Sequence, residues 1–104
     1  MKIRPEDIEV KIEFVQKEKM LARATLILGQ FEIRGYKILR SEKTLLVVYP
    51  PAVINSSKHY TDIVRITEKD DWHELQDYIL KKYDEAVEKT KYENINEQTR
   101  AGPD

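Results

Sequence analysis

The side chains best placed to do chemistry in this sequence are cations in its middle part. Residues 17–65 hold nine Lys or Arg against four acids, whereas residues 66–104 hold six basic and eleven acidic residues. A net charge of −1 therefore conceals two regions of opposite sign. Clustered Lys and Arg neutralise phosphates, so the basic region is typical of a polyanion-binding surface. The competing interpretation is that outward cations keep strand edges apart. The candidate nucleic-acid-binding residues are Arg34, Lys37, Arg40, Lys43, Lys58, His59 and Arg65.

Few side chains of the sequence are suited to catalysis or metal binding. The chain has two histidines, His59 and His73, and no cysteine, so it offers neither a thiolate nor a disulfide. Its three glycines are scattered, and no cluster of His, Asp or Glu indicates a metal site. We therefore expect no enzyme activity, metal, cofactor or small-molecule substrate. Asp62 is an acid in a predicted strand, and we expect it to pair with Arg65 or another base, or to accept N–H groups of the loop.

An apolar segment at residues 44–49 must position several of these cations. It ends at Pro50 and Pro51, which lack a backbone donor and have a fixed φ, so the sheet cannot continue through them. The polar loop at residues 52–59 then leaves the sheet at one edge and is the expected contact region. Continuous apolar character predicts burial on both faces, by a central position in the sheet or by a partner.

Alternation with a period of two predicts further strands along the chain. Its phase changes at Gly35, which predicts a β-bulge that moves Arg34 off the face of Arg40. Gly29 predicts a tight turn with positive φ. The five expected strands are residues 8–14, 20–28, 31–40, 44–49 and 60–66.

The C-terminal third changes to the period of a helix. Asp70 or Asp71 can cap its start, and apolar residues then recur at spacings of three or four, which predicts one amphipathic helix. The pattern ends near residue 90. We therefore expect one domain over residues 1–90 and a polar, flexible tail over residues 91–104. The apolar stripe is Trp72, Leu75, Ile79, Tyr83 and Ala86.

These segments predict an α+β fold, an antiparallel meander of about five strands followed by one long C-terminal helix. One helix covers one face of a sheet, yet apolar residues occupy both faces of the strands at residues 20–28 and 44–49. We expect a second copy to cover the other face, giving a homodimer held by sheet contacts. No segment approaches the roughly 20 apolar residues of a membrane helix. With no signal-peptide pattern and no cysteine, a cytoplasmic location is expected.

The stretches at residues 22–28 (ARATLIL), 31–38 (FEIRGYKI), 45–50 (LLVVYP) and 60–63 (YTDI), with a late Tyr83, occur in a characteristic order. This order resembles the stage V sporulation protein G family, also called the septation protein family, over about residues 8–83. The resemblance implies a small dimeric β-rich protein with a C-terminal helix. It also implies binding to DNA, and in some members RNA, in bacterial gene regulation. The chain departs from the family pattern at Thr44, Tyr49 and Pro51, lacks its His-Pro step after Asp62-Ile63, and has a less basic loop.

Two functions remain open from the sequence. The first is a dimeric regulator that binds DNA or RNA by contacting its backbone more than its base edges. This interpretation requires the basic residues to converge on one face of the dimer. The second is a protein-interaction module that recruits a partner through its acidic helix or an exposed strand edge, without binding nucleic acid.

Overall fold

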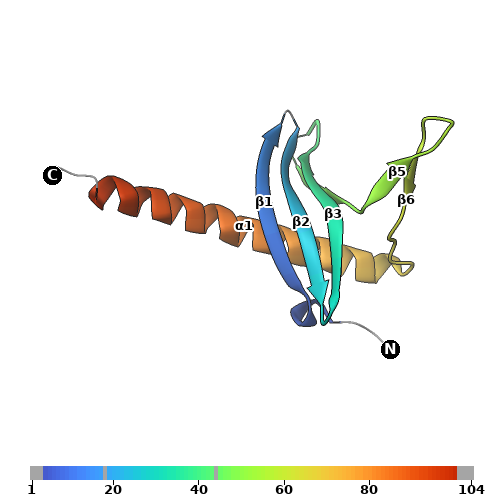
Figure 1. Ribbon diagram of the computed structural model, residues 1–104, viewed down its shortest axis with the longest axis horizontal. Coiled ribbons are helices and arrows are strands. Elements are labelled where there is room, and N and C mark those ends of the chain that lie inside the picture. Colours follow the sequence, from blue (N-terminus) through green and yellow to red (C-terminus); the bar gives the residue numbers. More distant parts are fainter. Residues whose placement is uncertain (1–3, 18, 44, 101–104) are drawn as a thin grey trace.

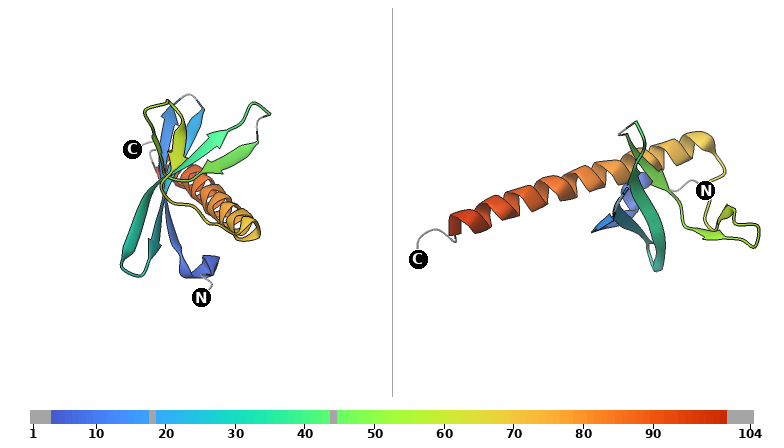
Figure 2. Two further views of the ribbon diagram at one scale, coloured as in Figure 1. Left: turned by 90° about the vertical axis from the view of Figure 1, so that its right-hand side faces the viewer. Right: turned by 90° about the horizontal axis from the view of Figure 1, so that it is seen from above.

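The computed structural model describes residues 4–17, 19–43 and 45–100 and shows an α+β architecture, as predicted. In this part of the chain one long helix crosses one face of a strongly twisted sheet (Figures 1 and 2). The elements are the 3-10 turn η1 (Pro5–Asp7), β1 (Glu9–Lys17), β2 (Met20–Leu28), β3 (Phe31–Arg40), β4 (Leu46–Tyr49), β5 (Ala52–Ile54), β6 (Tyr60–Asp62) and α1 (Lys69–Arg100).

The predicted five-stranded meander is wrong in its last strand. β1 to β4 form an antiparallel sheet in chain order, whereas β5 and β6 form a separate two-stranded hairpin. The sequence pattern predicts a loop at residues 52–54 and a last strand that extends to residue 66, whereas residues 52–54 are β5 and β6 ends at Asp62. Pro50 and Pro51 end β4 because neither can donate a ladder hydrogen bond. The chain then leaves the sheet, and its next two strands pair only with each other and project beyond β3 (Figure 1).

β4 is an edge strand, so the predicted central position is also wrong. It pairs with β3 alone, and Thr44, its expected first residue, lies outside the described residues. Val48 is buried under α1 at 4% exposure, whereas Tyr49 is 55% exposed and Leu45, just before the strand, 64% exposed. The apolar run therefore combines a core residue with outward-facing apolar side chains. Whether a partner covers them stays a prediction.

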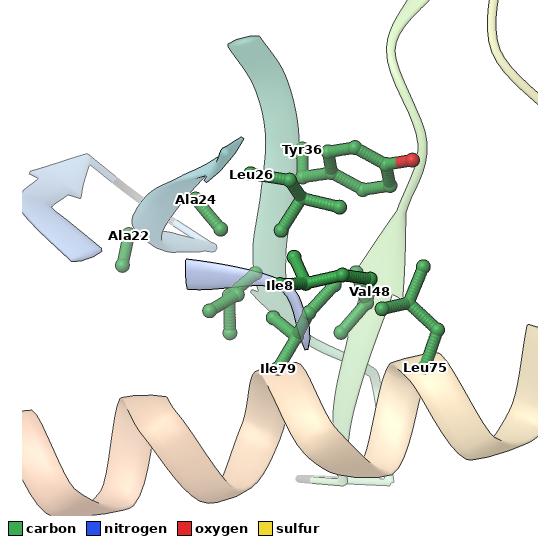
Figure 3. Close-up of a cluster of buried hydrophobic side chains, with 9 residues drawn as sticks. Ile8, Ala22, Ala24, Leu26, Tyr36, Val48, Leu75 and Ile79 are labelled. Atoms are coloured by element: carbon green, nitrogen blue, oxygen red, sulfur yellow. The ribbon is translucent and has the colours of Figure 1, made fainter. Parts of the chain in front are cut away.

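The core lies between the sheet and α1. Alternate residues of β2 face the helix, and Ala22 and Ala24 are fully buried there. The predicted helical stripe is confirmed, because Leu75 and Ile79 are buried (Figure 3). Trp72 packs against the same cluster. The buried residues include Ile8, Ala22, Ala24, Leu26, Tyr36, Ile38, Val48, Leu75 and Ile79.

α1 starts slightly earlier and continues further than the sequence predicts. Asp70 and Asp71 lie in its first turn, where carboxylates stabilise the positive end of the helix, instead of capping it. At Tyr83 the helix still contacts the sheet, with a ring-centroid distance of 5.9 Å to Phe14. Beyond that point α1 projects from the body of the protein, past the expected end at residue 90, to Arg100 (Figures 1 and 2). Residues 101–104 of the predicted tail lie outside the described residues.

The bulge predicted at Gly35 is confirmed. β3 has one residue more than β2 between two paired positions, so Arg34 and Gly35 both lie opposite Thr25. Gly35 has a φ of 107°, and a Cβ at this position would lie 3.2 Å from the Cβ of Pro51. Backbone conformation and close approach therefore both require glycine here. The turn predicted at Gly29 is confirmed too, with a φ of 56°.

Replacing Gly35 with Ala is expected to lower the free energy of unfolding by about 2–4 kcal/mol, because the new Cβ strains φ and meets Pro51. Gly29→Ala is the matched control. It also has positive φ but has nothing within 4 Å of its Cβ, so it should cost only about 1 kcal/mol. Urea unfolding followed by Trp72 fluorescence measures both variants, and equal losses would contradict a special role for the Pro51 contact.

Candidate functional site

The sheet face opposite α1, called the open face below, carries a row of exposed polar side chains. Lys37 on β3 pairs with Arg23 on β2 and with Tyr49 on β4, and Arg23 pairs with Glu13 on β1. Directly paired residues of antiparallel strands project to the same face. Two cations therefore stand side by side between an aromatic ring and a carboxylate.

The bulge places a further predicted cation on the open face. Arg34 is bonded to Glu32, with its Nε 3.3 Å from Oε1, and both side chains are largely exposed. An exposed ion pair contributes little to stability, but it partly neutralises the guanidinium. Lys11 pairs with Thr25 on the same face. The charged residues of the open face are Lys11, Arg23, Arg34, Lys37, Glu9, Glu13 and Glu32.

Arg40 and Lys43 lie where β3 turns into β4. This turn is at the same end of the sheet as the turn from β1 to β2, because the backbone N–H of Arg40 donates to the carbonyl oxygen of Lys19 at 3.1 Å (Figure 1). A shallow pocket of about 530 Å³ opens beside them and is lined by Lys17, Lys19, Met20 and Leu39. We call Lys17, Lys19, Arg40 and Lys43 the basic end of the sheet.

Lys58 and His59 occupy the turn of the β5–β6 hairpin. Asn55 organises this turn, because its Oδ1 accepts the backbone N–H of Ser57 at 2.9 Å and of His59 at 3.0 Å. The backbone N–H of Asn55 in turn donates to the carbonyl of His59 at 2.8 Å. Lys58 adopts a φ of 64°, which a side chain other than glycine tolerates only in a firmly held turn. The hairpin thus presents Lys58 and His59 at a rigid tip away from the sheet (Figure 1).

Arg65 lies in the segment between β6 and α1, which passes over a crevice between sheet and helix. Two adjoining pockets of about 410 and 470 Å³ flank this segment, and Arg65 and Tyr36 line both. Asp62 lines only the second pocket. Among the residues the structure describes, Asp62 is exposed, and its carboxylate makes neither the ion pair with Arg65 nor the loop hydrogen bonds expected of it.

The predicted site residues thus fall into separate groups. Arg34 and Lys37 share the open face, Arg40 and Lys43 share the basic end, and the other three lie on the hairpin or beside α1. The sequence analysis did not single out Lys11, Lys17, Lys19 and Arg23. The signal for Arg23 was present, since it alternates with the buried Ala22 and Ala24, but its pairing with Lys37 required the strand register.

The described residues do not form a metal centre. No group of three or more His, Asp or Glu side chains within them is arranged to hold a metal ion. Within the same residues, no helix is both long and apolar enough to cross a bilayer. One ionisable group is perturbed, since burial raises the pKa of the Tyr36 phenol above its usual value of 10.0.

The fold and its surfaces define a small α+β protein whose sheet has one helix-covered face and one charged, exposed face. No protein-family model matches the chain, and no curated protein matches it. The resemblance to the septation protein family therefore stays a prediction carried by the order and spacing of the segments described above.

The raised pKa of Tyr36 predicts a loss of stability in alkali. A phenol with a higher pKa in the folded state keeps its proton longer there, so folding stability is unaffected below about pH 10 and falls as the pH rises through the folded pKa. Tyr36→Phe is expected to remove part of this fall. Urea unfolding between pH 7 and 11 measures it, with Tyr60→Phe, on a 73% exposed ring, as the control. Parallel curves for wild type and Tyr36→Phe would refute the assignment.

Proposed function

We propose that this protein is a small dimeric regulator of the cytoplasm that binds DNA or RNA through the basic end and the adjoining row of the open face. The observation that carries the proposal is the meeting of two separate chain turns at one end of the sheet. Lys17 and Lys19 come from the β1–β2 turn, and Arg40 and Lys43 from the β3–β4 turn. Cations drawn from two turns make a surface that can neutralise several phosphates at once.

The row on the open face extends this surface toward the middle of the sheet. Arg40 lies three residues after Lys37 on β3 and projects to the opposite face, whereas Lys17 pairs with Met20, which pairs with Leu39, and so joins the basic end to the row of the open face. Arg23 stands beside Lys37 on β2. Such a stripe of cations contacts a polyanion through its backbone and supplies affinity without reading base edges. This agrees with the role in septation and sporulation regulation that the family resemblance implies.

Lys58 and His59 supply a second contact in the same proposal. The turn is held by hydrogen bonds to Asn55 and carries both side chains at a projecting tip. In a homodimer each subunit contributes one tip and one basic end. Two copies thereby double the number of phosphate contacts, which steepens the dependence of affinity on salt.

Charge reversal on the stripe is expected to weaken binding at least tenfold and to lower the slope of log affinity against log salt by about two, because two phosphate contacts are lost. Two double variants test the two parts separately, Arg23→Glu/Lys37→Glu and Lys19→Glu/Arg40→Glu. Fluorescence polarisation with labelled 30-mers of DNA and RNA at two salt concentrations measures the affinity.

The matched control is Lys81→Glu/Lys89→Glu on exposed positions of α1, which changes the net charge by the same amount. It should stay within about threefold of wild type, and all variants should melt at the wild-type temperature. The proposal fails if wild type binds neither nucleic acid at low salt, or if the control weakens binding as much as the stripe variants.

A second candidate function is a protein-interaction module that uses the exposed edge of β4. The edge position of this strand favours it, because an edge presents backbone N–H and C=O groups that an extended peptide can pair with. The acidic, projecting part of α1 is the alternative contact, although Lys82 already pairs with Glu85 there at 3.3 Å. The bond from the N–H of Ser41 to the carbonyl of Leu45 and the register of β4 leave the N–H of Leu46 pointing away from β3. Leu46→Pro removes this edge donor and is expected to abolish capture of a partner that nuclease treatment leaves bound. Capture that nuclease abolishes favours the first function instead.

A further inference from the structure

The β5–β6 hairpin has an apolar surface that contacts little of its own chain. Ile54 pairs with Tyr60 on one face, and Val53 pairs with Thr61 on the other. The exposed fractions are 52% for Val53, 57% for Ile54, 73% for Tyr60 and 63% for Ile63, which follows β6. Ile63 lies on the same face as Val53, opposite to Ile54 and Tyr60. We call Ile54 and Tyr60 the arm patch, and the β5–β6 hairpin that carries them the arm.

A two-stranded ribbon by itself is only marginally stable in water. At its base the two ends of the arm are joined, because the backbone N–H of Ile63 donates to the carbonyl of Pro51 at 2.7 Å. From there it projects away from the sheet and α1 (Figures 1 and 2). Its apolar side chains therefore need a covering surface from outside this chain.

The sequence of this region is unusually poor in charge. Residues 45–57 contain no Asp, Glu, Lys or Arg, although these four types make up 36% of the chain. The segment runs from the start of β4 into the arm. Depletion of charge is the compositional mark of an interface core, whereas a solvated surface of this protein is rich in Lys and Glu.

A second apolar surface lies on β4, at the edge of the open face. Tyr49 pairs with Lys37 on that face, and strand alternation places Val47 and Leu45 with it. Leu45 is 64% and Tyr49 55% exposed, and Val47 is half-buried. We call Leu45, Val47 and Tyr49 the β4 row.

We propose that the β5–β6 hairpin is a dimerisation arm, which packs its arm patch onto the β4 row of a second copy while receiving the arm of that copy on its own β4 row. This inference rests on the dimer in the proposed function and specifies its contact. Because one segment carries both surfaces, a single two-fold axis satisfies both contacts, as an isologous interface requires.

Charge and area favour a second copy over other occupants. Within residues 45–63 the only formal charges are Lys58 and Asp62, which cancel, so two copies meet without like-charge repulsion. Apart from Lys58 and His59 at the tip of the arm, residues 45–63 offer no cationic side chain to a nucleic acid. Because a two-fold axis repeats the contact between arm patch and β4 row, a second copy buries this apolar area twice, whereas another occupant buries it once.

The oligomeric state of Ile54→Glu/Tyr60→Glu tests the arm. Both side chains are exposed in the single chain, so the variant should retain the wild-type far-ultraviolet circular dichroism. Sedimentation equilibrium is expected to show a dimer for wild type and a dimer dissociation constant raised at least 100-fold in the variant. Phe31→Glu is the matched control, since Phe31 is 76% exposed but lies at the opposite end of the sheet, and it should dimerise as wild type does.

A cross-link tests the reciprocal geometry. Because the chain has no cysteine, Val47→Cys/Ile54→Cys introduces the only two thiols. Oxidation is expected to give a covalent dimer, whereas Phe31→Cys/Ile54→Cys should give little.

The outcomes separate this inference from the proposed function. A monomeric wild type at 100 µM refutes both the arm and the dimer. A dimer that persists in Ile54→Glu/Tyr60→Glu, or that fails to cross-link, refutes the arm while leaving the dimer. Loss of dimerisation in that variant, together with the cross-link, supports the arm whether or not the wild type binds nucleic acid.

Discussion

Pro50 and Pro51 determine which surfaces this protein exposes, because the sheet cannot extend through them. Pro51 packs beside Gly35, where a Cβ would lie 3.2 Å from the Cβ of Pro51, and Gly35, with a φ of 107°, forms part of the β3 bulge. The same contact therefore ends one strand and displaces a residue in its neighbour. It sends the following residues out as a hairpin and turns Arg34 toward the open face.

The two faces of the sheet carry different kinds of side chain. The face toward α1 is filled by small and branched side chains, with Ala22 and Ala24 leaving space for the helix, and it supplies the stability of the chain. The open face carries paired cations and, along β4, apolar side chains. A surface that contains both types can serve a polyanion and a protein partner on different strands, which is why the proposed nucleic-acid contact and the proposed dimer contact do not compete for the same residues.

The local sequence pattern predicted those features of the fold that depend only on residues close together in the chain. Alternation predicted β2 and β3 with their observed bounds, and the stripe through Leu75 and Ile79 predicted the buried side of α1. The bulge at Gly35 was predictable because a phase change and a glycine coincide in the sequence. The end of α1 was not, since a projecting helix needs no apolar period, and residues beyond 90 offer none.

The amino-acid pattern alone predicts the α+β class, the strand order up to β4, the break at the double proline and the segregation of charge. Three features depend on the folded chain, namely the edge position of β4, the separate hairpin at residues 52–62 and the meeting of Lys19 with Arg40. The physical reason is that strand order and cross-strand pairing depend on hydrogen bonds between residues far apart in the chain. An apolar run such as that of β4 has the same pattern whether a neighbouring strand, a helix or another subunit covers it.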